Sequence, residues 1–67
     1  MNFYKVKWSA RRAGGRRYTE TDYTLDRYAE QAAQHVREIH ATPLNGFRIE
    51  AVYKETRMGW EYVEVDD

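Results

Sequence analysis

Hydrophobic and polar residues alternate along residues 3–10 with a period of two. One face of this segment carries the apolar side chains Tyr4, Val6, Trp8 and Ala10, and the other carries Lys5, Lys7 and Ser9. This alternation predicts a half-buried strand. Gly14-Gly15 follows, and both glycines accept the positive φ angles of a tight hairpin turn. Residues 16–24, rich in Thr and Tyr, are predicted to form the return strand.

A two-residue turn at Gly14-Gly15 sets the register of this predicted hairpin. It places Trp8 opposite Thr21 and Val6 opposite Tyr23 on the apolar face. On the polar face, the same register pairs Lys7 with Asp22 and Ser9 with Glu20. The pairing brings like side chains together on one face and opposite charges together on the other, which supports the register.

Residues 25–40 have the period of an amphipathic helix. The apolar stripe is formed by Leu25, Ala29, Ala32, Val36 and Ile39, and Tyr28 widens it. Thr24 or Asp26 is expected to cap the start, and Thr42-Pro43 to end the helix, because proline cannot continue it.

Residues 47–55 and 60–65 are predicted to form a second hairpin. In the first segment Phe47, Ile49, Ala51 and Tyr53 share one face, and Arg48, Glu50, Val52 and Lys54 share the other. A three-residue loop ending at Gly59 pairs Tyr53 with Val63 and leaves Trp60 and Tyr62 on the face away from the core. The alternative register buries Trp60 and Tyr62 and exposes Val63 and Val65. Residues 65–67 are expected to fray.

The predicted order is therefore ββαββ, a single α+β domain over residues 1–67. Its mostly antiparallel four-stranded sheet is covered on one face by one helix. The chain has no cysteine, which excludes disulfides and cysteine–zinc sites. It also has no long apolar run for a membrane span or a signal peptide, so we expect a cytoplasmic protein, or one of the host cytoplasm if phage-encoded. Few aliphatic residues and many aromatic ones predict a marginal core, which a partner or homodimer formation would stabilise.

The formal net charge is zero, but the charges are segregated. Residues 1–17 carry six basic side chains and no acidic one, whereas residues 58–67 carry four acidic side chains and no basic one. Four arginines flank the Gly14-Gly15 turn, and guanidinium groups bind phosphate or carboxylate in bidentate fashion. With the aromatic residues of the uncovered sheet face, these bases form the predicted partner-binding set: Lys5, Lys7, Arg11, Arg12, Arg16, Arg17, Trp60 and Tyr62.

No catalytic or metal-binding constellation is recognisable. His35 and His40 are five residues apart, so on a helix they point in different directions and are expected to be surface histidines. Ser9, the only serine, has no histidine near it in sequence. Glu20 and Asp22 are better explained as members of a salt-bridged strand face than as a hydrolase pair. We therefore expect a protein that is not an enzyme and uses neither metal nor cofactor.

The chain resembles small phage-encoded anti-CRISPR proteins, the compact type I inhibitors in which one helix packs on an antiparallel sheet. The likeness rests on Tyr4, Gln31-Ala32, Phe47-Arg48-Ile49-Glu50, Val52 and Tyr53-Lys54-Glu55. It implies an inhibitor that uses basic side chains to occupy the DNA path of a surveillance complex. The helix positions that are basic in the relative are Ala33 and Gln34 here, and the basic charge lies on the Gly14-Gly15 hairpin instead.

Two functions follow from these features. The first is a non-catalytic phage-type protein that inhibits or modulates a host defence protein or ribonucleoprotein complex by occupying its surface. The alternative is a small nucleic-acid-binding module that uses the arginine-rich hairpin, with a salt-dependent affinity. The acidic C-terminal residues argue against the alternative, because they would repel the same polyanion.

Overall fold

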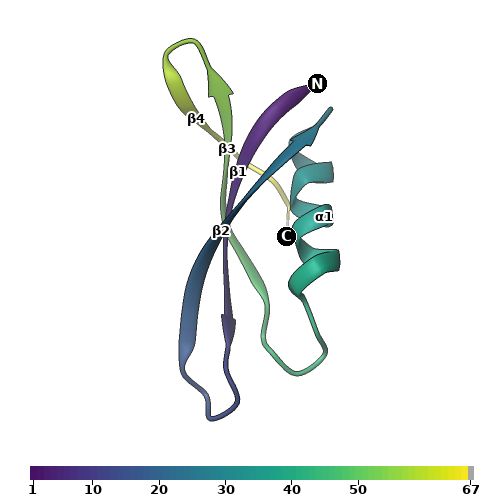
Figure 1. Ribbon diagram of the computed structural model, residues 1–67, viewed down its shortest axis with the longest axis vertical. Helices are drawn as coiled ribbons and strands as arrows, with labels where there is room; N and C mark the ends of the chain where they lie inside the picture. Colours follow the sequence, from purple (N-terminus) through teal and green to yellow (C-terminus); the bar gives the residue numbers. More distant parts are fainter. Residues whose placement is uncertain (67) are drawn as a thin grey trace.

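The computed structural model describes residues 1–66. The elements follow one another as β1 (Asn2–Arg11), β2 (Arg17–Asp26), α1 (Ala29–His40), β3 (Arg48–Thr56) and β4 (Gly59–Val63). The strands form one antiparallel sheet in the order β2-β1-β3-β4, and α1 lies along one face of it (Figure 1). This arrangement confirms the predicted two-layer α+β fold. The molecule is elongated, 41 × 19 × 17 Å, with the β1–β2 turn and the β3–β4 turn at opposite ends.

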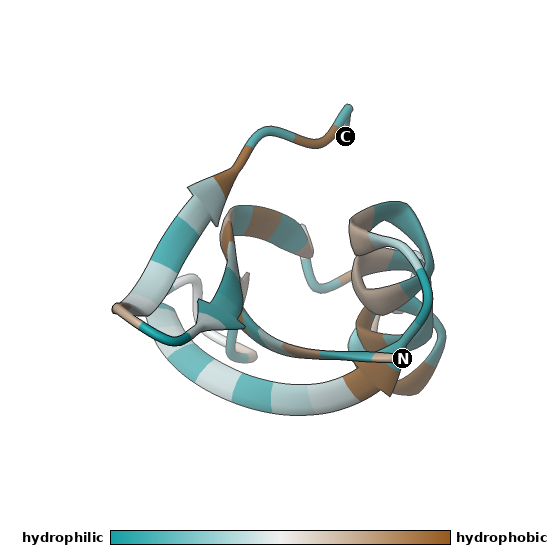
Figure 2. Cartoon of the chain, turned by 90° about the horizontal axis from the view of Figure 1, so that it is seen from above, coloured by the Kyte–Doolittle hydropathy of each residue, from teal (hydrophilic) through white to brown (hydrophobic). Residues whose placement is uncertain are grey.

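The hydrophobic core fills the space between α1 and the sheet. The helix contributes Ala29, Ala32, Ala33 and Val36, and the sheet contributes Tyr4, Val6, Trp8, Ala10, Ile49 and Val52. Three alanines on the buried side let α1 approach the strands closely, while its hydrophilic side faces away from the sheet (Figure 2). The apolar face predicted for β1 is thus confirmed. Burial of one such valine contributes about 1.5–3 kcal/mol to stability.

The predicted register of the first hairpin is wrong by one residue. Trp8 lies opposite Glu20 and Val6 opposite Asp22, whereas Lys7 lies opposite Thr21 and Ser9 opposite Thr19. The reason is the turn, in which the Arg12 amide donates to the Arg16 carbonyl and the Gly15 amide donates to the Arg12 carbonyl, both at 2.9 Å. The turn therefore has three residues, not two, between the hydrogen-bonded Arg12 and Arg16. This difference of one residue moves each β2 side chain to the opposite face of the sheet. Gly14 and Gly15 have φ angles of 103° and 96°, as predicted for the turn.

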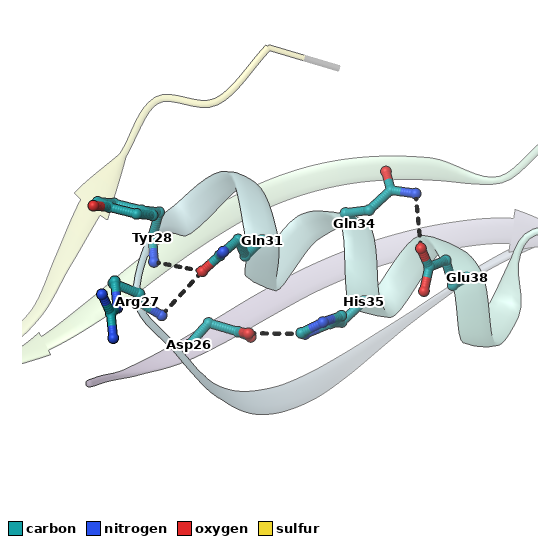
Figure 3. A network of polar contacts seen from close by, with 7 residues as sticks. All are labelled: Asp26, Arg27, Tyr28, Gln31, Gln34, His35 and Glu38. Atoms are coloured by element: carbon teal, nitrogen blue, oxygen red, sulfur yellow. Dashed lines mark hydrogen bonds and ion pairs between the residues drawn. The ribbon is translucent and has the colours of Figure 1, made fainter.

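The helix starts four residues later than predicted. Leu25 belongs to β2 and is exposed, and Ile39 at the other end of the predicted stripe is also exposed. Neither Thr24 nor Asp26 caps α1; instead Gln31 Oε1 accepts hydrogen bonds from the Arg27 and Tyr28 amides, both at 3.2 Å (Figure 3). The predicted stop at Thr42-Pro43 is confirmed, because α1 ends at His40.

A β-bulge reverses the faces of β3 part-way along the strand. β1 pairs Lys7 with Ala51 but Trp8 with Ile49, so one extra residue, Glu50, is inserted. Ile49 and Val52 both reach the core as a result, and Tyr53 points to the opposite face. The predicted alternation, which put Val52 away from the core and Tyr53 beside Ile49, is therefore wrong beyond the bulge.

The last hairpin has a two-residue turn, Arg57-Met58, rather than the expected three-residue loop. Tyr53 lies opposite Tyr62, and Val52 lies opposite Val63. Val63 and Val65 pack against the core cluster, which contradicts the expected fraying of Val65. Asp66 is exposed and belongs to no strand, and Asp67 lies outside the described residues. Of the two alternatives for Trp60 and Tyr62, the one that places both on the face away from the core agrees with the structure, in which they contact side chains of that face.

Candidate binding surfaces

The sheet face opposite α1 carries a group of aromatic side chains, here called the aromatic patch. All four strands contribute to it, with Tyr23 from β2, Phe3 from β1, Tyr53 from β3, and Trp60 and Tyr62 from β4. Sequence analysis identified Trp60 and Tyr62 as members of this face. It missed Tyr23 and Tyr53, because the wrong hairpin register and the unforeseen bulge assigned both to the core face.

The rings of the patch pack against one another. Phe3 stacks on Tyr23 with ring centroids 5.7 Å apart and planes 12° apart, and Trp60 lies 5.9 Å from Phe3 and 6.1 Å from Tyr23. Tyr53 and Tyr62 form an edge-on pair at 5.9 Å. Such pairs contribute about 0.5–1.5 kcal/mol beyond their area burial, which gives the patch a defined shape.

Lys5 lies in the middle of the patch and links its two ring groups. Its Nζ is 4.7 Å from the Trp60 ring centroid and 4.9 Å from that of Tyr53, both within the range of a cation–π contact. Lys7, two residues further along β1, is exposed on the same sheet face. The patch therefore combines aromatic rings with positive charge.

Much of the patch remains open to solvent. Tyr62 is 60% exposed, Tyr23 56% and Trp60 38%, and the neighbouring Leu25 is 64% exposed. Contiguous exposed apolar groups with a polar rim are typical of interaction sites, and tyrosine and tryptophan are favoured anchors. The described residues contain no pocket, so the patch is a surface rather than a cavity.

The four arginines of the β1–β2 turn lie at one end of the molecule, remote from the β3–β4 turn (Figure 1). Arg11, Arg12 and Arg16 are exposed and Arg17 is half-buried, and the side chains of Arg12 and Arg17 make contacts within the chain. Arg12 lies over the Tyr18 ring, 4.4 Å from its centroid. Arg17 donates to Ser9 Oγ at 2.7 Å and to the Gly46 carbonyl at 3.1 Å. Part of the predicted set is therefore structural as well as basic.

The α1–β3 loop is fastened beside this arginine turn by Asn45. Its Nδ2 donates to the His40 carbonyl at 2.9 Å, and its Oδ1 accepts from the Thr42 and Phe47 amides. The Asn45 carbonyl accepts from the Arg11 amide at 2.7 Å. The loop leads into Arg48, which lies opposite Ser9 and is exposed. Arg48 thus joins the arginines of the turn, which the sequence alone did not indicate.

Both histidines of α1 pair with aspartates of β2; His35 is exposed, as expected of a surface histidine, whereas His40 is half-buried. His35 Nδ1 lies 2.9 Å from Asp26 Oδ1, which is visible in Figure 3. His40 Nε2 lies 2.7 Å from Asp22 Oδ2, and the His40 ring stacks on Trp8 at 4.2 Å. Asp22 Oδ1 also accepts a 3.1 Å hydrogen bond from Trp8 Nε1. These contacts attach α1 to β2. They are possible because the observed register places the two aspartates on the sheet face that carries the helix.

The remaining candidate chemistry gives no site of its own. Ser9 is buried, donates to Glu50 and accepts from Arg17, so its hydroxyl takes part in a structural network. Residues 1–66 contain no group of three or more side chains suited to holding a metal ion. Within the same range, no helix is long and apolar enough to cross a membrane. No protein family, curated protein or solved structure matches the chain, so the anti-CRISPR resemblance stays a prediction.

Proposed function

We propose that this chain is a non-catalytic, phage-type binding protein that inhibits or modulates a host defence protein or ribonucleoprotein complex by covering part of its surface with the aromatic patch. The observation that carries the proposal is the exposure of Tyr23, Trp60 and Tyr62 on a sheet face that no element of residues 1–66 covers. A buried aromatic side chain removes roughly 150–250 Å² from water. Because these rings stay partly exposed in the free chain, much of their apolar area is left to be buried by a partner.

The composition of the patch fits a protein interface. The centre of a stable interface is usually apolar and aromatic, and its rim is polar and wet. Here the rings form the centre, while Lys7 and Glu55, both exposed on neighbouring strands, lie beside them. Because the rings already pack on one another, little side-chain entropy is lost on binding, which favours affinity.

The resemblance to anti-CRISPR inhibitors supports the choice of a type I surveillance complex as the first target to test. Two alternative occupants of the patch can be distinguished experimentally from a surveillance complex. A second copy of this chain would produce a concentration-dependent homodimer, which light scattering after size exclusion measures directly. A nucleic acid would be removed by nuclease treatment.

The test is a quantitative binding assay between the tagged chain and purified, nuclease-treated surveillance complex, followed by capture from host lysate. Trp60→Ala combined with Tyr62→Ala should weaken the complex at least 30-fold, since a single hot-spot residue contributes about 2 kcal/mol or more. Ile39→Ala combined with Leu44→Ala removes two exposed apolar side chains outside the patch and should leave binding unchanged. Equal binding of both double variants, with both folded, would show that the aromatic patch is not the contact surface.

A further inference from the structure

We infer that the arginine-rich end is a second and separate binding site, one that takes the phosphodiester backbone of a nucleic acid. This end comprises Arg11, Arg12, Arg16 and Arg17 of the β1–β2 turn together with Arg48 at the start of β3. None of these side chains belongs to the aromatic patch. The inference therefore stands independently of the protein-binding role proposed above.

The fold assembles this charge from two segments that are distant in sequence. Antiparallel pairing of Ser9 with Arg48 brings β3 alongside the arginine turn. Gly46 has a φ of +57°, and a Cβ there would lie 3.3 Å from Arg17 Nη2, so the loop backbone passes close to that guanidinium. Like charges gathered in this way destabilise the free chain, which is consistent with a bound anion compensating them.

Two of the five guanidinium groups are already held in position. Arg17 is fixed between Ser9 and the Gly46 carbonyl, and Arg12 lies on the Tyr18 ring. The exposed Arg11, Arg16 and Arg48 flank these anchored groups. Preorganised donors lose less entropy on binding, and each planar guanidinium can bridge two phosphate oxygens.

Two carboxylates lie near this end: Glu50, which accepts from Ser9 beside Arg17, and the exposed Glu20, three residues from Arg17 on β2. The five arginines outnumber these two acidic groups, so the end keeps a net positive charge. The acidic C-terminal segment follows Val63, which is level with Val6 through Val52. The segment therefore starts about 16 Å, or five strand residues, from the level of Arg11, and it leaves the sheet there because β4 ends at Val63. Figure 1 likewise shows the C-terminal segment beside α1, away from the β1–β2 turn. The fold therefore places the acidic segment beside the helix and not beside the arginine turn.

The chemistry of this end favours phosphate over an acidic protein. A protein partner would need an apolar centre to bury, but the turn itself offers only Ala13, Gly14 and Gly15 between its arginines. A regular array of phosphates needs no such centre, and a projecting two-stranded ribbon is of a size that enters the major groove. The turn carries no Asn or Gln side chain, so binding should not depend on base sequence.

The experiment is fluorescence anisotropy of the full chain with labelled 20-nucleotide single-stranded DNA, the matching duplex and single-stranded RNA, at 50–200 mM salt. Engagement of four phosphates on the duplex predicts a log–log slope near −3.6, or about a 150-fold loss of affinity across this range. Arg11→Ala combined with Arg16→Ala should make the slope shallower by about 2.

Arg27→Ala combined with Arg57→Ala is the matched control, because it removes the same charge from exposed positions away from the arginine-rich end. It should leave the slope unchanged, and so should Trp60→Ala. Binding of both kinds of probe, with slopes near −0.9 per phosphate contacted on the duplex and −0.7 on the single strands, would identify the backbone as the ligand. Absence of binding at 50 mM salt, an equal loss in the Arg27/Arg57 variant, or tighter binding to poly-glutamate than to every nucleic acid would overturn the inference.

Discussion

Substitution of Asp22 tests the attachment of the helix to the sheet. The Asp22 carboxylate accepts the Trp8 indole N–H at 3.1 Å and lies 2.7 Å from His40 Nε2. Trp8 is only 3% exposed, so in Asp22→Ala its N–H loses its partner without gaining free access to water. Such an unsatisfied donor costs about 1–3 kcal/mol. Loss of the partly exposed contact with His40 adds about 0.2–1 kcal/mol.

We therefore expect Asp22→Ala to lower the free energy of unfolding by about 2–3 kcal/mol. In a domain of this size that corresponds to a decrease in Tm of roughly 10–20 °C. Asp22→Asn keeps an oxygen for the indole and removes only the charge, so it should cost about 1 kcal/mol. Thermal and urea unfolding followed by far-UV circular dichroism give both values.

A double-mutant cycle with His40→Ala separates the two contacts of Asp22. The coupling free energy between Asp22 and His40 should be smaller than the difference between the Ala and Asn variants at position 22. The reasoning fails if Asp22→Asn is as destabilising as Asp22→Ala, because the indole hydrogen bond would then not be the main term. It fails equally if neither substitution changes stability.

Two further predictions concern the core and the α1–β3 loop. Val36→Ala, at a fully buried helix position, should lower the free energy of unfolding by about 2 kcal/mol. Ile39→Ala, on the exposed side of the helix, should change it by less than about 0.5 kcal/mol. Chemical denaturation measures both values, and a larger effect of Ile39→Ala would contradict the helix face described above. Asn45→Ala removes the bonds to the His40 carbonyl and the Phe47 amide and should cost about 1–2 kcal/mol. Amide hydrogen exchange should then speed up in this loop first, and uniform exchange changes would argue against a local role.

The order and type of the elements were predictable from the sequence because periodicity and turn residues carry that information. The alternation from Tyr4 to Ala10 indicated β1 and its buried face, and the alanine-rich segment ending before Pro43 indicated the helix. The β1–β2 turn was also recognised from Gly14-Gly15. Each of these signals is local, so no knowledge of the rest of the chain was needed.

The faces of β2 and of the second half of β3 were not predictable in this way. A turn of three residues instead of two, and one inserted residue at Glu50, each change the parity of a strand. Tyr23 and Tyr53 consequently left the predicted core and became part of the aromatic patch. Two of the five rings of the aromatic patch thus depend on two single-residue differences, one in a turn and one in a strand, that only the complete packing determines. The alternation of apolar and polar residues within each strand is compatible with either face pointing to the core.

The sheet order β2-β1-β3-β4 has a consequence for how the chain folds. Each hairpin joins neighbours in sequence and can form within microseconds, whereas β1 and β3 meet only after the intervening helix and loops have been closed into place. We therefore expect the slow step of folding to be the pairing of β1 with β3, together with the packing of α1 over these two strands. Side chains where β1 meets β3, such as Val6 and Val52, should contribute most to the folding transition state. The aromatic patch should form only when the sheet is complete.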